Sequence, residues 1–85
     1  MISLWFSERA LLDIDRFSDF LEVIVNAVEV LRRHPFIGRP IENGLRELVV
    51  SRGDSGYVAL YEFNTARNEI TVHKLRHQLE AGYSD

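Results

Sequence analysis

The first half of the chain carries one continuous helical pattern of apolar residues. Between Ala10 and Leu31 these residues recur at alternating spacings of four and three, and polar residues keep the same rhythm on the opposite side. That spacing is typical of an amphipathic helix. Ser7 suits the N-cap, and Pro35 ends the helix because proline disfavours helical angles in the residue before it. We therefore expect a single helix over residues 8–33.

The same segment also allows two shorter helices, since Asp19 and Glu22 have the spacing of a capping box. We favour the single helix because no glycine or proline lies between Ser7 and Pro35. An inserted loop would normally disturb the phase of the pattern. One helix of this length, about 39 Å, would overhang a seven-residue strand of about 23 Å.

The second half of this segment is apolar beyond one stripe, with additions such as Phe20, Val23 and Val25. Helices that are apolar on more than one face are buried on more than one face. The segment is either a well-covered core helix or a helix that pairs with its copy in a homodimer. We expect the homodimer. Its predicted interface is Phe17, Phe20, Leu21, Ile24, Val28 and Leu31.

Four segments alternate apolar and polar residues as strands do, namely residues 2–6, 45–51, 57–64 and 69–76. A connector rich in glycine and proline follows the helix, and short turns separate the last three strands. The order β-α-β-β-β predicts an α+β fold with a small antiparallel sheet, in one domain over residues 1–85. We expect Tyr57, Tyr61 and Phe63 to lie in its core.

Composition narrows the class of protein. The 85 residues are 46% hydrophobic and 27% charged, as in an ordinary small globular domain. No apolar run approaches the roughly 18 residues of a membrane span, so we expect a cytoplasmic protein. The chain has no cysteine, which excludes disulfides and thiolate metal sites. Its net charge of −3 also argues against a polyanion binder, which usually carries a basic excess.

Four motifs occur in an order that resembles the RelE/ParE toxin superfamily. This resemblance implies a small antiparallel sheet faced by two antiparallel helices, and a toxin of a bacterial type II toxin–antitoxin (plasmid stabilisation) system with a cognate antitoxin. The chain lacks about a dozen residues of the family's helical region between Phe17 and Val28, which agrees with a single helix. The motifs are Pro35-Phe36-Ile37-Gly38-Arg39-Pro40, Leu45-Arg46-Glu47-Leu48, the run from Ser55 to Tyr61, and the segment from Arg76 to Tyr83.

The resemblance implies two alternative activities. In toxins similar to RelE, which cleave mRNA on the ribosome, a central-strand arginine corresponds here to Val58, a later basic residue to His77 and a C-terminal tyrosine to Tyr83. Because Val58 carries no charge, we favour the ParE-like alternative, inhibition of growth by binding a protein, with DNA gyrase as the candidate. A third hypothesis is a shortened, non-toxic relative that binds an antitoxin or itself.

The candidate site residues follow from these alternatives. His77 and Tyr83 are the candidate catalytic residues, although a surface histidine and an apolar clamp explain them as well. Arg46, Arg52 and Arg76 are candidates for binding the target or antitoxin, or they only keep a strand face soluble. His73 and His77 are four apart on a strand, about 13 Å, so we expect no zinc site, no other metal and no cofactor. An antitoxin would bind as a helix in a groove or as an added strand.

Overall fold

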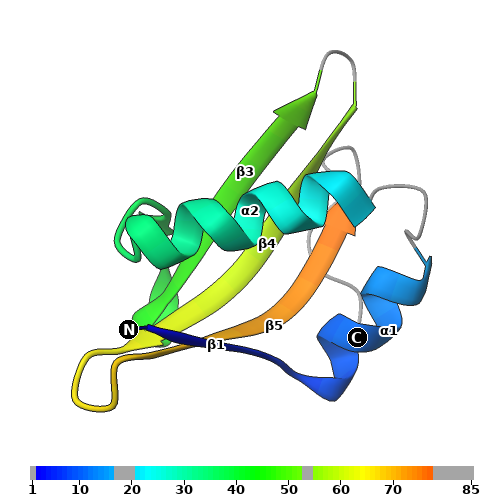
Figure 1. Ribbon diagram of the computed structural model, residues 1–85. Helices are drawn as coiled ribbons and strands as arrows, with labels where there is room; N and C mark the ends of the chain where they lie inside the picture. The colour runs from blue at the N-terminus through cyan, green and yellow to red at the C-terminus, as the bar shows by residue number, and fades with distance from the viewer. Residues whose placement is uncertain (1, 17–20, 53–54, 78–85) are drawn as a thin grey trace.

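Five strands form one mixed sheet in the order β1-β5-β4-β3-β2 (Figure 1). The computed structural model describes residues 2–16, 21–52 and 55–77. The last four strands are antiparallel neighbours, whereas β1 lies parallel to β5. The elements are β1 (Ser3–Phe6), α1 (Glu8–Arg16), α2 (Leu21–Arg33), β2 (Arg39–Pro40), the 3₁₀ turn η2 (Glu42–Gly44), β3 (Leu45–Arg52), β4 (Ser55–Asn64) and β5 (Glu69–His77).

The α+β class is confirmed, but the expectation of an antiparallel sheet is wrong at one edge. β1 pairs with β5, the strand furthest from it in the chain, and the two run in the same direction. Parallel neighbours require a long crossover connection, which the helices and the intervening strands supply here. Alternation within a four-residue strand carries no information about its partner, so the sequence pattern did not reveal this direction.

The single helix over residues 8–33 is also wrong, because the structure has two helices, α1 and α2. Their axes point in clearly different directions, and α2 crosses over β3, β4 and β5 (Figure 1). The longest dimension of the fold is only 35 Å, shorter than the 26-residue rod would be. Both helices bury an apolar stripe against the same sheet, so their patterns keep one phase although the chain changes direction.

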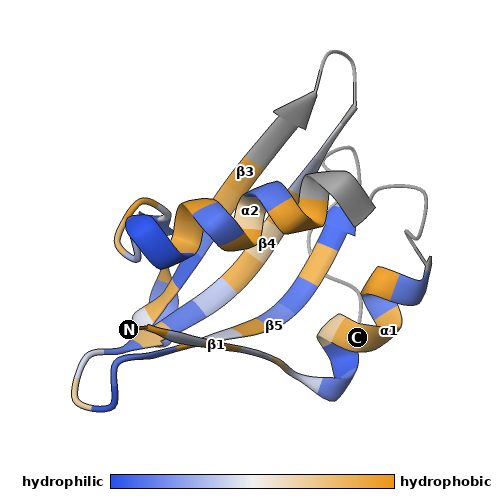
Figure 2. Ribbon diagram, in the orientation of Figure 1, coloured by the Kyte–Doolittle hydropathy of each residue, from blue (hydrophilic) through white to orange (hydrophobic). Residues whose placement is uncertain are grey.

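The core lies between the helices and the face of the sheet that they cover, which we call the helix face. Apolar and polar positions alternate along β5 and along α2 (Figure 2), as expected for elements covered on one side. Tyr57 and Tyr61 are buried as predicted, and Phe63 is half-buried. The buried cluster comprises Ala10, Ile24, Ala27, Leu31, Leu48, Ala59, Tyr61, Ile70, Val72 and Leu75.

Side chains of α1 continue the pairing of β5 where β1 ends. Ser7 is the N-cap predicted from the sequence, since its Oγ accepts a hydrogen bond from the Ala10 N–H at 3.0 Å. The same hydroxyl donates to the His73 carbonyl at 2.7 Å, and the buried carboxylate of Asp13 accepts from the Leu75 N–H at 2.9 Å. The edge of β5 is thereby closed by side chains beyond the last paired residue of β1.

No helix in the described ranges is both long and apolar enough to cross a membrane.

Candidate functional site

The face of the sheet turned away from the helices contains a cavity of about 330 Å³. Cross-strand register explains its lining, because Val58 lies opposite Val49 on one side and Arg76 on the other, and Glu47 lies opposite Arg39. Directly opposed residues project from the same face of a sheet. We call this the open-face cavity. Its lining residues are Arg39, Glu47, Val49, Val58 and Arg76.

Glu47 lies between the two arginines of the open-face cavity. Its Oε1 is 2.7 Å from Arg39 Nη2, and its Oε2 is 4.0 Å from Arg76 Nη2. The Glu47 and Arg76 side chains are largely buried, whereas that of Arg39 is exposed. The carboxylate therefore offsets part of the positive charge, and the cavity has two guanidinium groups with a net charge of about +1.

Val58 forms the apolar floor of the open-face cavity. Only 2% of its surface is exposed, and it lies among the residues that line the cavity. A valine side chain neither carries charge nor transfers a proton. Arg76, directly opposite on β5, is the nearest cation by register.

Arg46 lies on the helix face and not with Arg76. It is paired with Tyr61 across the strands, and its Nη1 donates to the carbonyls of Phe36 at 3.1 Å and Gly38 at 2.7 Å. Its guanidinium carbon also lies 5.0 Å from the centre of the Phe36 ring, within cation–π range. The structure therefore separates two of the three arginines predicted to share a binding surface, and Arg46 holds the connector that follows α2.

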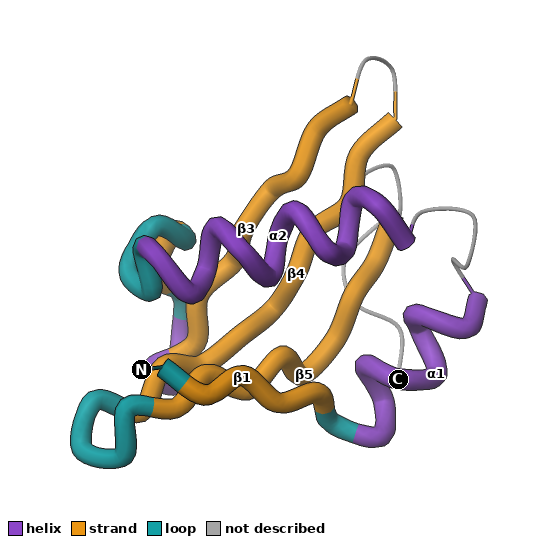
Figure 3. Tube along the Cα trace, viewed as in Figure 1, coloured by secondary structure: helices purple, strands orange, loops and turns teal. Residues whose placement is uncertain are grey.

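Tyr61 also holds this connector, through two hydrogen bonds of its hydroxyl group. Its hydroxyl donates to the Pro35 carbonyl at 2.9 Å and accepts from the Gly38 N–H at 2.8 Å. Burial raises the pKa of the Tyr61 phenol above its ordinary value of 10.0, although the Gly38 N–H and the Arg46 charge act to lower it. Gly38 lies so close that an added Cβ would stand 2.6 Å from the tyrosine. The connector is shown as a loop at the end of α2 in Figure 3.

The remaining predicted site residues lie at the limits of the described chain. Arg52 ends β3 opposite Ser55, and His77 ends β5 opposite Tyr57, but their side chains lie outside the described residues. Tyr83 lies outside them altogether. His73 is described, and its Nε2 is 3.3 Å from the Glu62 carboxylate. Within the described ranges, no three histidine or acidic side chains gather to hold a metal ion.

The predicted dimer interface is partly covered by the chain itself. Ile24 and Leu31 are buried in the core, and Val28 is half-buried. Phe17 and Phe20 lie outside the described residues, as does the side chain of Leu21.

Sequence reasoning missed Arg39 and Glu47 as neighbours of Arg76. Arg39 belongs to a two-residue strand, which is too short to show periodicity, so its pairing with Glu47 was not visible. The alternation of β3 did carry a usable signal. Because Leu48 points into the core, Glu47 and Val49 had to point to the other face, together with whatever pairs with them.

Solved structures with a similar arrangement define the fold class as RelE-like. The E. coli RelBE toxin–antitoxin complex aligns with a TM-score of 0.72 and 19% identity over 88% of this chain and 94% of the solved chain. The RelBE2 complex of Mycobacterium tuberculosis aligns at 0.69, with 20% identity over 93% of each chain. The P. aeruginosa ParDE system aligns at 0.67, with 23% identity over 88% and 94%.

Sequence similarity then identifies the family. No protein-family profile matches the chain. Over 76 residues it is 34% identical to the toxin RelE3 of Caulobacter vibrioides, and this alignment spans 89% of the chain and 77% of the relative. The chain belongs to the RelE/ParE toxin superfamily.

Proposed function

We propose that this protein is the toxin of a bacterial type II toxin–antitoxin system, acts in the cytoplasm and inhibits growth by binding a protein target. The observation that carries the mode of action is Val58, an uncharged and buried side chain at the floor of the open-face cavity. Glu47 also engages the neighbouring arginines. Such a surface suits recognition of a polar partner better than acid–base catalysis on RNA. DNA gyrase is the candidate target.

A cognate antitoxin is the second element of the proposal. The solved relatives RelBE and ParDE are toxin–antitoxin complexes, which supports a partner of this kind for the present chain. β3 extends to Arg52, whereas β2 pairs only with Arg46 and Glu47. Among the described strands, residues 48–52 therefore have one unpaired edge, to which an antitoxin segment would add as a strand.

A RelE-like mRNA endonuclease is the alternative function, and a specific observation favours it. Arg76 faces Val58 across the strand pair, so a cation stands next to the position of the family's central arginine. Arg39 is a second cation at the same cavity. The relative from Caulobacter vibrioides is itself named as a RelE toxin.

Controlled expression in a bacterium tests the toxin, and two purified assays separate the mechanisms. We expect growth to stop on induction and to resume when the adjacent antitoxin is co-expressed. Purified protein should inhibit DNA supercoiling by gyrase and leave ribosome-bound mRNA intact. Cleaved mRNA with unaffected gyrase would establish the alternative. Unimpeded growth would instead identify a non-toxic, shortened relative.

A homodimer through the second half of the helical segment stays a prediction. It rests on the apolar residues outside the main stripe, and the chain's own core already covers Ile24 and Leu31.

A further inference from the structure

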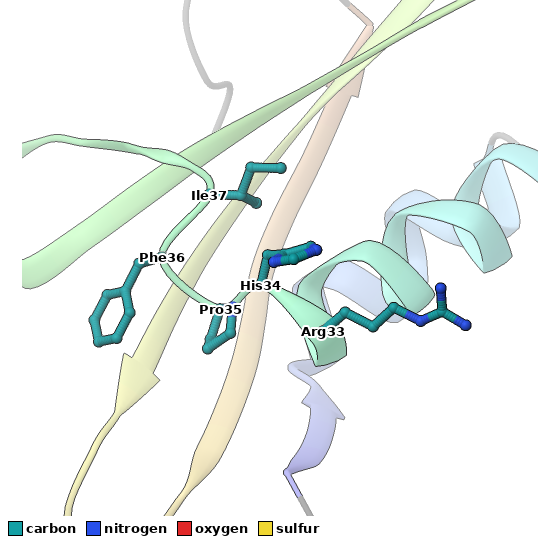
Figure 4. Close-up of a pocket in the computed structure, with 5 residues that line it drawn as sticks. All are labelled: Arg33, His34, Pro35, Phe36 and Ile37. Atoms are coloured by element: carbon teal, nitrogen blue, oxygen red, sulfur yellow. The ribbon is translucent and has the colours of Figure 1, made fainter.

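A hollow of about 530 Å³ opens where α2 ends and the connector begins (Figure 4). Phe36 and Ile37 are exposed over 57% and 51% of their surface, and as neighbours in the chain they form a contiguous apolar area. Arg33 and His34 border them and are exposed as well. We call this the basic hollow. Its lining residues are Arg33, His34, Pro35, Phe36 and Ile37.

The outward side of α1 has the complementary character. Leu11 and Leu12 are exposed over 54% and 66% of their surface. Glu8 and Asp15 are also exposed, and the spacings of three, four and seven put all four side chains on one helix face. We call this the acidic patch. It presents two apolar side chains between two carboxylates, whereas the basic hollow presents two apolar side chains that follow Arg33 and His34 in the chain.

The charged groups of both surfaces form no ion pair within the part of the chain that the structure describes. The ion pairs found there involve other side chains, and none reaches Glu8, Asp15, Arg33 or His34. Glu29 precedes Arg33 by one turn of α2, and no ion pair joins them either. Each surface therefore offers unpaired charge of one sign beside exposed apolar area.

The two surfaces cannot meet within one molecule. The end of α2 that carries the basic hollow and the helix α1 lie on opposite sides of the fold (Figure 1). We infer that a second copy of this chain docks its acidic patch into the basic hollow, so that Leu11 and Leu12 cover Phe36 and Ile37 and a carboxylate faces the Arg33 guanidinium.

This contact joins two different surfaces, so it is a head-to-tail contact and not a two-fold dimer. The pair retains one free basic hollow on one copy and one free acidic patch on the other, which allows further copies to add. Few side chains take part, so the interface falls in the small, weak class. The inference does not depend on the toxin activity, since neither surface belongs to the open-face cavity.

Sedimentation velocity of the purified protein gives the first test. We expect the average mass to rise above the 9.9 kDa of one chain between about 10 µM and about 1 mM protein. Raising the salt from about 0.05 M to about 0.5 M should reverse the rise, because charge attraction between exposed groups is screened. A constant monomer mass across this range would overturn the inference.

Variants of each surface give the second test. Leu12→Lys disrupts the acidic patch and Ile37→Glu the basic hollow, and each should weaken self-association by about tenfold or more. Val25→Lys is the matched control, because Val25 is also exposed, over 52% of its surface, but belongs to neither surface. It should associate as the unmodified chain does. Equal loss in all three variants would contradict the assignment.

Mixing the two variants distinguishes this arrangement from a two-fold dimer in which each surface meets its own copy. Leu12→Lys protein retains an intact basic hollow, and Ile37→Glu protein retains an intact acidic patch. The mixture should form a one-to-one pair that cannot grow further, although neither variant associates alone. Failure of the mixture to pair, with both variants folded by circular dichroism, would refute the head-to-tail contact.

Discussion

The two faces of the sheet use the same residue type for different purposes. On the helix face, Arg46 donates to two connector carbonyls and stacks on Phe36, so its charge is occupied by the chain itself. On the other face, Arg76 lines the open-face cavity beside Arg39. The two arginines belong to strands of one sheet, and the parity of each position decides which face it joins. Charge counts along the sequence do not distinguish an arginine that holds a connector from one that lines a cavity.

The largest expected effect concerns the tight packing of the helix face. Gly38→Ala should reduce the free energy of unfolding by about 3 kcal/mol, because the new Cβ would stand 2.6 Å from the Tyr61 ring and 2.8 Å from the Glu47 carbonyl. Urea denaturation measures this. Gly44→Ala is the matched control, since its Cβ meets open space and only the positive φ of 74° opposes it, a cost of about 1 kcal/mol. An equal loss of stability in both variants would mean that the close packing of Gly38 against Tyr61 contributes nothing to the cost.

Tyr61→Phe should cost about 2 kcal/mol. The substitution removes the hydroxyl that joins the Pro35 carbonyl to the buried Gly38 N–H, and it leaves that N–H without its partner. Chemical denaturation at neutral pH measures the loss. A change below about 0.5 kcal/mol would show that these bonds contribute little net stability.

Lysine at the two arginine positions tests the contrast between the faces directly. Arg46→Lys should lower the free energy of unfolding by about 1 kcal/mol, because lysine cannot make the same planar contacts, and it should leave growth inhibition unchanged. Arg76→Lys should also lower the free energy of unfolding by about 1 kcal/mol, because the Arg76 side chain is largely buried beside Glu47, but it should weaken growth inhibition. Denaturation and induced expression give the two readouts for each variant. The reverse result would place the functional surface on the helix face.

The smallest expected effect is a pH dependence. Because burial raises the pKa of Tyr61 above 10.0, the phenol stays protonated in the folded chain at a pH where the unfolded chain loses its proton. This contribution is fully present below pH 10 and is lost as pH rises toward the folded pKa, so stability falls. Tyr61→Phe should remove that part of the decline. Parallel curves for both proteins above pH 10 would contradict it.

Local features were predictable from the sequence because each depends on near neighbours. Ser7 as N-cap, the last three strands and the burial of Tyr57 and Tyr61 all follow from spacing and residue type. The break between α1 and α2 was not predictable from the spacing of apolar residues, since two helices that pack on one sheet can share the same helical periodicity. The direction of β1 depends on its pairing with residues more than 60 positions away, which alternation does not encode.

The candidate site was only partly predictable for the same reason. Arg76 was singled out, but its neighbours come from β2 and β3, and a two-residue strand leaves no periodic trace. Arg46 was grouped with Arg76, but it projects from the helix face, where the carbonyls of Phe36 and Gly38 accept its hydrogen bonds. Leu48 in the core was the one available indication that Arg46 and Glu47 point in opposite directions.

The closure of β5 by Ser7 and Asp13 also bears on how the chain folds during synthesis. Both bonds link residues more than 60 positions apart, and β5 lies between β1 and β4 in the sheet. Contacts of such long separation form slowly, because loop closure precedes any gain. A nascent chain that has not yet released β5 from the ribosome lacks the strand to which β1 and α1 attach. The assembled open-face cavity therefore arises only after translation has passed residue 77.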